Sequence, residues 1–510
     1  MSTQHSPAAA APVEPTAVPP VEPLGRRFTA ALGATGAANL ADGVLGMGVP
    51  LVALTLTRSP GQIALITAAA WLPWLLLGLV AGVLVDRQDR RVVQIVAMTV
   101  RAAVLATGVA LIATDRLTMT ALVMIALVYG ATEVFADLAA GALVPDLVPR
   151  SRLGAANGRT LAVQTVTNSF VGAPIAGAVL TLGTGWVFGV PAALAVAAAV
   201  LLWRGIPGRY RHERTERKRA GREVVEGVTF LARHRVLGPL LLSGSLMNMA
   251  STGYFAVFVL WAVGPGSELG MRAEHYTLLA ATLAVGAVGG SFVAEALTRR
   301  VGEVRLMLGC WLANSLLLVV PVLVRSVGAV AVTLFLLGFT NTIGNVISMS
   351  MRQRIVPATM LGRVGGAGRT LGYGLMPVGA LLAGFVAETW GLEAVFVGGT
   401  ALAVLATLGS MAVVRQRMVD AAEAAVLAAA VAHDEDDARP DDETPSDGGD
   451  THGAVQDDDS RTDDDREVAA VRTTDVAAPP TNGAPTTATP DEPVRTDARP
   501  VARPLAEATA

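Results

Sequence analysis

The stretch Gly82-Val83-Leu84-Val85-Asp86-Arg87-Gln88-Asp89-Arg90-Arg91 lies between two apolar runs and has a counterpart later in the chain. The counterpart also lies between two apolar runs and reads Ser291-Phe292-Val293-Ala294-Glu295-Ala296-Leu297-Thr298-Arg299-Arg300. Asp86 aligns with Glu295, and each acid is followed one helical turn later by an arginine pair. This repetition indicates a membrane protein built from two related halves, which is a common architecture of secondary transporters.

A second repeat supports the duplication. The dipeptides Val148-Pro149 and Val356-Pro357 each lead, at nearly the same offset, into the tetrapeptide Gly-Arg-Thr-Leu, which occupies residues 158–161 and 368–371. A single shared tetrapeptide could arise by chance, whereas two repeats in the same order favour duplication.

The composition agrees with a membrane protein. The chain is 52% hydrophobic and its mean hydropathy is +0.51, which exceeds the balance of soluble proteins. One Cys and six His exclude a disulfide framework and a Cys/His metal cluster. We therefore expect no metal site and no bound cofactor.

Twelve stretches are long and apolar enough to cross a bilayer, which requires about 20 residues each. They cover approximately residues 29–57, 61–84, 92–114, 118–143, 155–181, 186–204, 236–263, 275–298, 305–324, 327–351, 364–388 and 392–414. The predicted fold class is an all-α membrane protein with twelve transmembrane helices in two six-helix halves.

Arginine placement predicts the orientation, because cytoplasmic loops carry an excess of basic residues. The arginine-rich side carries Arg26, Arg27, Arg87, Arg90, Arg91, Arg150, Arg152, the cluster from Arg204 to Arg235, Arg299, Arg300, Arg305, Arg352, Arg354, Arg363, Arg415 and Arg417. The opposite loops carry only Arg58, Arg116, Arg272 and Arg325. We expect a multi-pass protein of the cell inner (plasma) membrane with both termini in the cytoplasm.

The same reading divides the chain into five parts. The N-terminal part is Pro/Ala-rich and the C-terminal part is acidic, and we expect both to be disordered. The linker between the halves contains apolar residues at helical spacing, which predicts a short interfacial helix. The five parts are residues 1–25, the disordered N-terminal segment; 26–204, the first six-helix bundle; 205–235, the cytoplasmic linker; 236–414, the second six-helix bundle; and 415–510, the acidic tail.

Charged residues within the spans are costly and therefore indicate function. The first half contains Asp42, Arg101, Glu133 and Asp137 inside its apolar runs, and we find none near mid-depth in the second half. Arg101 is predicted to lie at the depth of Glu133 and Asp137, so that it neutralises one of them. The remaining carboxylates could carry protons, with Asp42 as the preferred candidate. A static ion network that positions the helices is the alternative.

The second half offers neutral polar side chains instead. Asn248 and Tyr254 lie in one predicted span, and Asn341 and Asn345 lie on one face of another. These four residues are candidates for lining an amphipathic substrate cavity. The alternative is that each forms a hydrogen bond between helices.

These motifs resemble a known family. Residues 82–91 look like the signature between helices 2 and 3 of the major facilitator superfamily. The stretch Gly172-Ala173-Pro174-Ile175-Ala176-Gly177 is similar to the Gly/Pro-rich motif of its drug/proton antiporters, with Ala173 and Ala176 as departures. The stretches 145–149, 153–157 and 226–231 resemble the branch with the enterobactin exporters and macrolide-efflux proteins. The resemblance covers residues 26–415.

The resemblance implies gating roles for the repeated loops. In such proteins the loop acid caps a neighbouring helix and the arginines clamp the two halves together on the cytoplasmic side. The glycines around the proline permit close helix approach and a bend, and residues 376–379 offer a matching flexible point. The implied gating residues are Gly82, Asp86, Arg87, Arg90, Arg91, Glu295, Arg299, Arg300, Gly172, Pro174 and Gly177.

The resulting hypothesis is a secondary transporter that exports small amphipathic molecules, such as drugs, macrolides or siderophore-like compounds, in exchange for protons by alternating access. Its only energy source would be the proton gradient, and we expect a monomer in the lipid bilayer that does not bind nucleic acid. The sequence contains no Gly-x-x-x-x-Gly-Lys-Ser/Thr and no His-Glu-x-x-His, which argues against an ATP-driven pump and an intramembrane enzyme. Two alternatives stay open: a transport-silent sensor or scaffold that signals through its acidic tail, and an importer or uniporter of the same fold.

Overall fold

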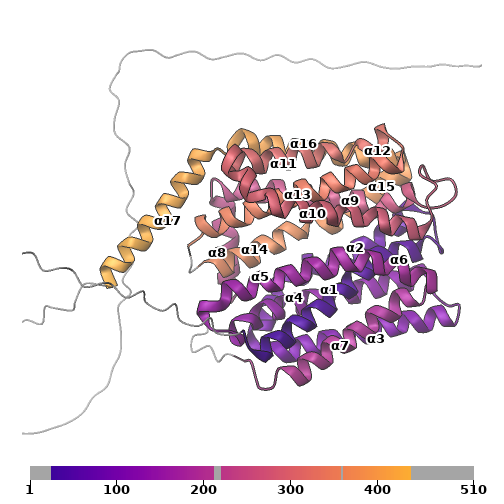
Figure 1. Cartoon of the computed structure of the whole chain (residues 1–510), viewed down its shortest axis with the longest axis horizontal. Coiled ribbons are helices and arrows are strands. Elements are labelled where there is room, and N and C mark those ends of the chain that lie inside the picture. The colour runs from indigo at the N-terminus through magenta and orange to yellow at the C-terminus, as the bar shows by residue number, and fades with distance from the viewer. Residues whose placement is uncertain (1–23, 212–219, 358–359, 438–510) are drawn as a thin grey trace, which may run out of the picture. The chain divides into compact units, whose positions relative to one another are not determined.

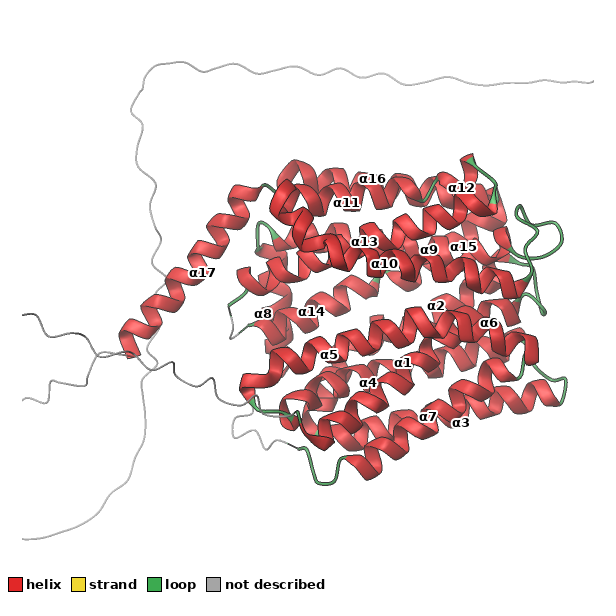
Figure 2. Ribbon diagram, viewed as in Figure 1, coloured by secondary structure: helices red, strands yellow, loops and turns green. Residues whose placement is uncertain are grey.

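The structure, a computed structural model, describes residues 24–211, 220–357 and 360–437. Within these ranges the chain forms helices joined by loops, with no strand (Figure 2), and twelve segments are long and apolar enough to cross a membrane. The twelve segments agree with the predicted spans to within a few residues at each end. The predicted fold class is therefore confirmed.

The first half contains six spans, which Figure 1 shows in indigo to magenta. Its elements are α1 (Gly25–Ala53), α2 (Pro60–Arg87), α3 (Arg90–Ala113), α4 (Met119–Leu147), the short η1 (Arg150–Arg152), α5 (Leu153–Thr165), η2 (Val166–Val171), α6 (Gly172–Leu182) and α7 (Trp186–Gly205). The linker contributes α8 (Ala220–Arg233).

The second half repeats this plan. Its elements are α9 (Leu237–Ala262), α10 (Ala273–Val301), α11 (Glu303–Leu317), α12 (Val320–Leu323), α13 (Val327–Ile355), α14 (Leu361–Gly374), α15 (Met376–Trp390) and α16 (Leu392–Val413), followed by α17 (Gln416–Asp437). The ninth span is divided into α11 and α12, and the fifth span of each half is also split: α5, η2 and α6 form the fifth, and α14 and α15 form the eleventh.

Proline explains where the fifth and eleventh spans are interrupted. Pro174 has no N–H to donate into the preceding turn, and the turns before it are wound as the π-helix η2, a form often found where a helix must bend. In the eleventh span α14 ends at Gly374 and α15 begins with Pro377 in its first turn. Both interruptions lie where the sequence predicted flexible points.

Glycines allow the split spans to contact their neighbours closely. A Cβ on Gly43 of α1 would clash with the carbonyl oxygen of Asn168, and a Cβ on Gly172 would lie 2.7 Å from the Gly43 Cα. In the second half a Cβ on Gly253 of α9 would lie 2.7 Å from the carbonyl oxygen of Gly379 in α15. The two halves therefore repeat the same close contact between their first and fifth helices.

The two halves are sealed together at one end of the bundle, which we call the Arg58 end. The guanidinium of Arg58 donates to the carbonyl oxygen of Val263 at 2.8 Å, and the Ser59 hydroxyl donates to Glu388 at 2.6 Å. A Cβ on Gly177 of α6 would clash with the hydroxyl of Thr277 in α10. These contacts join α2 to α9 and α15, and α6 to α10.

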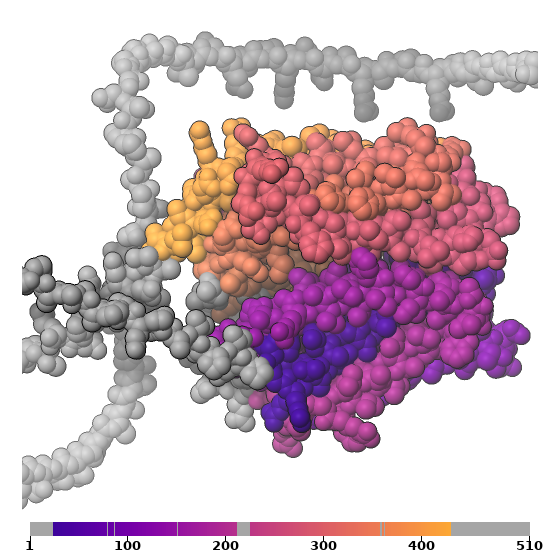
Figure 3. Space-filling view, viewed as in Figure 1, coloured from indigo at the N-terminus to yellow at the C-terminus, as the bar shows by residue number. Residues whose placement is uncertain are grey.

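The opposite end, which carries α8 and which we call the linker end, is more open. The contacts of α10 with the first half are mainly with α6 and η2, toward the Arg58 end, rather than with α5, and Figure 3 shows a hollow between the two halves on the side of α17. The bundle thus has one closed end and one open end.

The linker and the tail differ in how they meet the bundle. The predicted linker helix exists as α8 and packs on α14, where Arg363 donates to Glu226 at 3.0 Å. Disorder from residue 415 onward is wrong for the first part of the tail, because Gln416–Asp437 form α17 (Figure 1). Alanine dominates this segment and favours helix, and Arg354 pairs with Glu423 at 3.2 Å. Residues 1–23 and 438–510 lie outside the described residues.

Candidate transport site

Arg101 is the centre of the candidate site. It lies in α3 and its side chain is completely buried. Its guanidinium donates to Asp42 of α1 at 3.1 Å, to Glu133 of α4, and through Nε to the Thr132 hydroxyl at 3.2 Å. Charge-assisted hydrogen bonds of this kind are the strong ones in proteins. The predicted contact between Arg101 and an acid of α4 is present, and Asp42 is a second partner.

Tyr129 completes this cluster. Its hydroxyl donates to the Asp42 carboxylate, and its ring lies under the Arg101 guanidinium, with 4.3 Å between the guanidinium carbon and the ring centroid. Tyr129 and Thr132 are linked in turn, because the Thr132 hydroxyl donates to the Tyr129 carbonyl at 2.6 Å. Sequence reasoning missed both residues, since a tyrosine and a threonine inside an apolar helix carry no charge to draw attention.

The cluster contains one more acid than base. Asp42 and Glu133 each bring a negative charge, and among the described residues Arg101 brings the only positive charge in contact with them. Burying an uncompensated charge costs several kcal/mol. A single proton on either carboxyl would make the cluster neutral. The arrangement can therefore hold one exchangeable proton.

Asp137 does not join this cluster. Its carboxylate instead accepts from Arg369 of α14 at 2.6 Å, so the pair bridges the two halves. The prediction that the second half has no charged residue near mid-depth stays a prediction, but it overlooked Arg369, which lies six residues inside the span Arg363–Trp390. Arg369 lies in the second Gly-Arg-Thr-Leu repeat, which the sequence identified only as evidence of duplication. The glycines at the start of α14 lower the hydropathy of this segment, so the sequence pattern places Arg369 at the end of the span rather than inside it.

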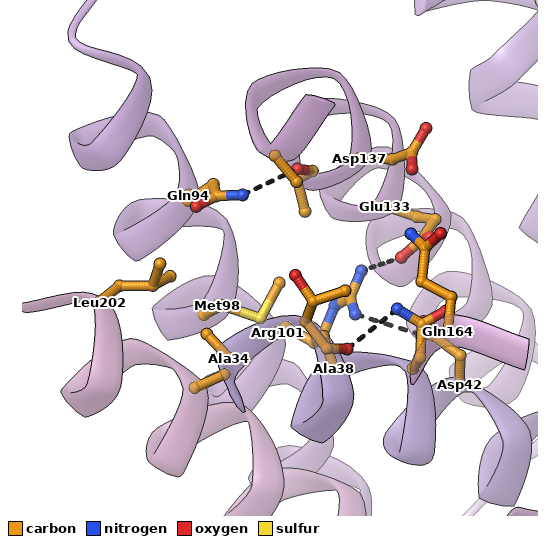
Figure 4. A pocket seen from close by; sticks show the side chains of 15 residues that line it. Ala34, Ala38, Asp42, Gln94, Met98, Arg101, Glu133, Asp137, Gln164 and Leu202 are labelled. Carbon is orange, nitrogen blue, oxygen red and sulfur yellow. Dashed lines mark hydrogen bonds and ion pairs between the residues drawn. The ribbon is translucent and has the colours of Figure 1, made fainter. Parts of the chain in front are cut away.

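A small cavity extends from the cluster within the first half. Figure 4 shows Arg101 between Asp42 and Glu133, with Asp137 at the edge. The cavity has a volume of about 40 Å³, enough for a few water molecules but too small for a drug-sized molecule. Its lining includes the polar residues Thr35, Asn39, Asp42, Gln94, Arg101, Glu133, Asp137 and Gln164. Gln94 is buried, and its side-chain oxygen has no hydrogen-bond partner among the described residues.

The first repeated loop ties helices together within the first half. Arg90 donates to Asp146 of α4 at 2.8 Å, and Arg91 donates to the carbonyl oxygens of Leu202 at 3.1 Å and Trp203 at 2.6 Å. Arg91 thereby satisfies the carbonyls at the end of α7, which have no partner within the helix. In this conformation none of these contacts reaches a described residue of the second half, unlike the implied clamp between halves.

The other predicted residues of this loop contribute little to holding the helices together. Arg87 is exposed, and nothing lies within 4 Å of where a Cβ on Gly82 would be. The side chain of Asp86 lies outside what the structure describes. Its capping role stays a prediction.

The second repeated loop differs from the first. Glu295 and Arg299 pair with each other at 2.6 Å along an exposed face of α10, and Arg300 is also exposed. The contact between helices is made instead by Glu303, the first residue of α11, with Arg354 near the end of α13 at 2.5 Å. This pair occupies the place of Arg90 and Asp146 with the charges exchanged.

The four predicted substrate-binding residues are separated by the structure. Tyr254 is 1% exposed and packs against Phe258 and Phe396 within the second half, so its predicted place on a cavity is wrong. Its aromatic neighbours provide a better-packed environment than a polar cavity does. Asn248 donates to the carbonyl of Gly372 at 3.1 Å and ties α9 to α14.

Asn341 and Asn345 are both exposed on α13. Asn345 donates to the Asn341 side chain at 2.9 Å, which is a contact along one helix face rather than between helices. The structure leaves both side chains accessible, and their predicted role in substrate binding remains a prediction.

Comparison with known proteins agrees with this architecture. The family model described as "Transmembrane secretion effector" matches residues 22–438. The enterobactin exporter EntS of Escherichia coli O1:K1 / APEC is 30% identical over 336 residues, which cover 64% of this chain and 76% of that protein. EntS of Citrobacter koseri is 29% identical over 339 residues, with the same coverage.

Solved structures show the same fold. A bacterial homologue of the iron transporter ferroportin in an inward-facing state gives a TM-score of 0.60 at 15% identity, covering 76% of this chain and 98% of that chain. The nucleoside transporter NupG gives a TM-score of 0.58 at 12% identity, with the same coverage. With a family match over most of its length, the chain belongs to the transmembrane secretion effector family, a group of multi-pass membrane transporters within the major facilitator superfamily, and resembles its enterobactin-exporter branch.

Proposed function

We propose that the chain exports small amphipathic molecules from the cytoplasm across the plasma membrane in exchange for protons. It acts as a monomer, and the proton gradient is its only energy source. The family and its relatives support transport, and export is the activity named for the enterobactin exporters. The observation that carries proton exchange is the buried cluster of Arg101 with two carboxylates from two different helices.

The arginine distribution supports a cytoplasmic linker end, because basic residues gather in cytoplasmic loops. Under this orientation both termini are cytoplasmic, and the structure is open to the cytoplasm and sealed outside by Arg58, Ser59 and Glu388. This is the state in which an exporter takes up its substrate. Breaking the outer seal while closing the linker end would then release the substrate outside.

Asp42 is the carboxyl that we propose exchanges the proton. It contacts both Arg101 and Tyr129 and also lines the cavity. A proton that reaches Asp42 removes its charge and weakens its bond to Arg101, which leaves Glu133 as the main partner of the arginine. Since Asp42 is in α1 and Glu133 in α4, the proton would change how these two helices are held together. This provides a link between protonation and helix movement.

The test uses the full chain in liposomes with an imposed pH gradient. Asp42→Asn imitates a permanently protonated carboxyl, so it should still bind substrate and exchange it across the membrane but should lose gradient-driven efflux. Glu133→Gln is the matched control and should mainly weaken folding or affinity. Unchanged gradient-driven efflux by Asp42→Asn would remove Asp42 from the coupling role.

A second variant separates export from the alternative of a signalling scaffold. Deleting residues 438–510 removes the acidic tail and leaves every described contact of the bundle in place. An exporter should keep its efflux after this deletion. Loss of all transport by a stably inserted, shortened chain would favour a role for the tail that the proposal does not include.

A further inference from the structure

Two arginines of the second half lie on the neighbouring helices α13 and α14. Arg369 lies in α14, and Arg352 lies in the last turn of α13. The Nη1 atom of Arg352 lies 3.6 Å from where a Cβ on Gly368, the residue before Arg369, would be. The Arg352 guanidinium therefore packs against α14 at the turn that carries Arg369. Like charges repel, and an anion between them would relieve the repulsion.

The two arginines differ in their partners. Arg369 has the carboxylate of Asp137 at 2.6 Å. Arg352 is partly buried, and no carboxylate among the described residues lies within 4.0 Å of it. A partly buried cation is costly when no acid offsets it. An anion supplied from outside the chain would provide that compensation.

Aromatic side chains adjoin the arginine pair. Tyr373 follows Arg369 by one turn of α14. Its ring centroid lies 5.6 Å from those of both Trp71 and Trp74 in α2. The aromatic surface thus joins the first half to the second beside two positive charges. Rings of this kind bind apolar and aromatic groups.

We propose that Arg352 and Arg369 form an anion-binding site for the substrate, with Tyr373 contacting its apolar body, and that Asp137 occupies this site when the substrate is absent. The inference rests on the proposed export function and narrows its substrate class to amphipathic anions, such as aromatic carboxylates. Arginine suits this role because its planar guanidinium binds a carboxylate through two parallel hydrogen bonds.

The charges at the site explain how a substrate anion could replace Asp137. Asp137 neutralises Arg369 across the two halves, and Arg352 retains its charge. A substrate carboxylate that binds between the two arginines would meet two positive charges, whereas Asp137 meets mainly one. The substrate can therefore displace Asp137 from Arg369. Asp137 then acts as an internal competitor that lowers the affinity for the anion.

The test measures binding to the purified full chain in neutral detergent, without a pH gradient. The probe is 1-pyrenebutyrate, and its neutral amide 1-pyrenebutanamide is the matched control. Energy transfer from the tryptophans to pyrene reports binding of both. Arg369→Ala and Arg352→Gln should each weaken pyrenebutyrate binding by about tenfold or more, the value of a charge-assisted hydrogen bond. Binding of the amide should be unchanged.

Asp137→Asn should have the opposite effect on pyrenebutyrate binding. Removing the competitor should strengthen pyrenebutyrate binding several-fold and leave the amide unaffected. Arg305→Ala, an exposed arginine of α11, is the control for loss of one positive charge and should leave both affinities unchanged. Asp137→Asn and Arg352→Gln keep the test decisive if Arg369→Ala does not fold.

Three outcomes would overturn the site. They are the absence of saturable pyrenebutyrate binding, equal losses for the acid and the amide in the arginine variants, and weaker anion binding in Asp137→Asn. Competition by phosphatidylglycerol at the same arginines would assign the site to a lipid headgroup instead. Because binding is measured without a gradient, the absence of gradient-driven efflux by the unmodified chain, with intact charge-selective binding, would contradict proton exchange and leave the anion site standing.

Discussion

Replacing Arg101 with methionine tests whether the buried cluster is balanced by its single cation. Methionine fills a similar length of space without charge. The substitution removes bonds to Asp42, Glu133 and Thr132 at once and leaves two carboxylates without a cation. Breaking a buried ion pair by removing one partner costs about 3–5 kcal/mol in soluble proteins. We expect a loss of stability of this order when both carboxyls are ionised.

The loss should depend on pH in a definite direction. In the variant the carboxylates have lost their cation, so protons that neutralise them stabilise the fold. Thermal unfolding in detergent should therefore show a larger deficit for Arg101→Met at pH 8 than at pH 5. Adding Asp42→Asn and Glu133→Gln removes both unpaired charges and should restore most of the stability even at pH 8.

A matched control uses an exposed pair. Arg299 and Glu295 are separated by one turn and their side chains are 69% and 84% exposed, so Arg299→Met should cost less than about 1 kcal/mol. Equal losses in Arg101→Met and Arg299→Met would refute the reasoning. So would a deficit that is the same at both pH values and unchanged by neutralising the two acids.

Three further changes test other parts of the structure. Gly177→Leu should push Thr277 away and open the Arg58 end, seen as a longer distance between spin labels on the Arg58 and Val263 loops; an unchanged distance would contradict this seal. Arg90→Ala should destabilise the fold by about 1–3 kcal/mol, measured by thermal unfolding, because it removes a charge-assisted bond to Asp146. An unchanged unfolding temperature would show that the pair does not stabilise the fold. Burial lowers the pKa of His234, whose Nδ1 accepts from the first N–H groups of α9, so the stability it adds is fully present above its ordinary pKa of 6.5 and is lost as pH falls through the lowered value. Accordingly His234→Ala should cost about 0.5–2 kcal/mol at pH 7.5 and progressively less as the pH falls through the lowered pKa, and a cost that does not change with pH would disprove the cap.

The sequence predicted the fold well because its signals are long and repeated. Each span is a continuous apolar run, and the loops around Asp86 and Glu295 mark the same place in both halves. The charged residues of the first half were also predictable, since a charge inside an apolar run is conspicuous. The pairing of Arg101 with Asp42 was not, because it depends on how α1 and α3 pack rather than on spacing within one helix.

Residues near helix ends and within aromatic clusters were harder to interpret. Arg369 lies eight residues into α14, and the surrounding glycines conceal its depth. Tyr254 has a polar hydroxyl and was therefore assigned to a cavity, although its ring is held by Phe258 and Phe396. Hydropathy reports the average of a segment, and it does not report which neighbours a single side chain finds.

Aligning the helices of the two halves shows how the second half replaces the buried charges of the first. The helices α4 and α13 are both 29 residues long, and aligning them places Thr132 on Thr340. In α3 and α11, aligned at their first residues, Arg101 falls on Asn314. The bond is repeated as well: Arg101 donates to the Thr132 hydroxyl at 3.2 Å, and Asn314 donates to the Thr340 hydroxyl at 3.1 Å.

The same alignment places Glu133 and Asp137 of α4 on Asn341 and Asn345 of α13. The second half therefore keeps the geometry of the cluster and replaces its charges with amides, which donate and accept hydrogen bonds but exchange no proton. Because the amides need no buried cation, Asn314 can take the place of the arginine without loss of charge balance. One half is thus equipped to carry a proton, and the matching place in the other half is neutral. In the same alignment Arg352 falls on Val144, and Arg369 repeats Arg159 but pairs with Asp137 of the other half. Both placements are consistent with a role toward the substrate rather than the proton.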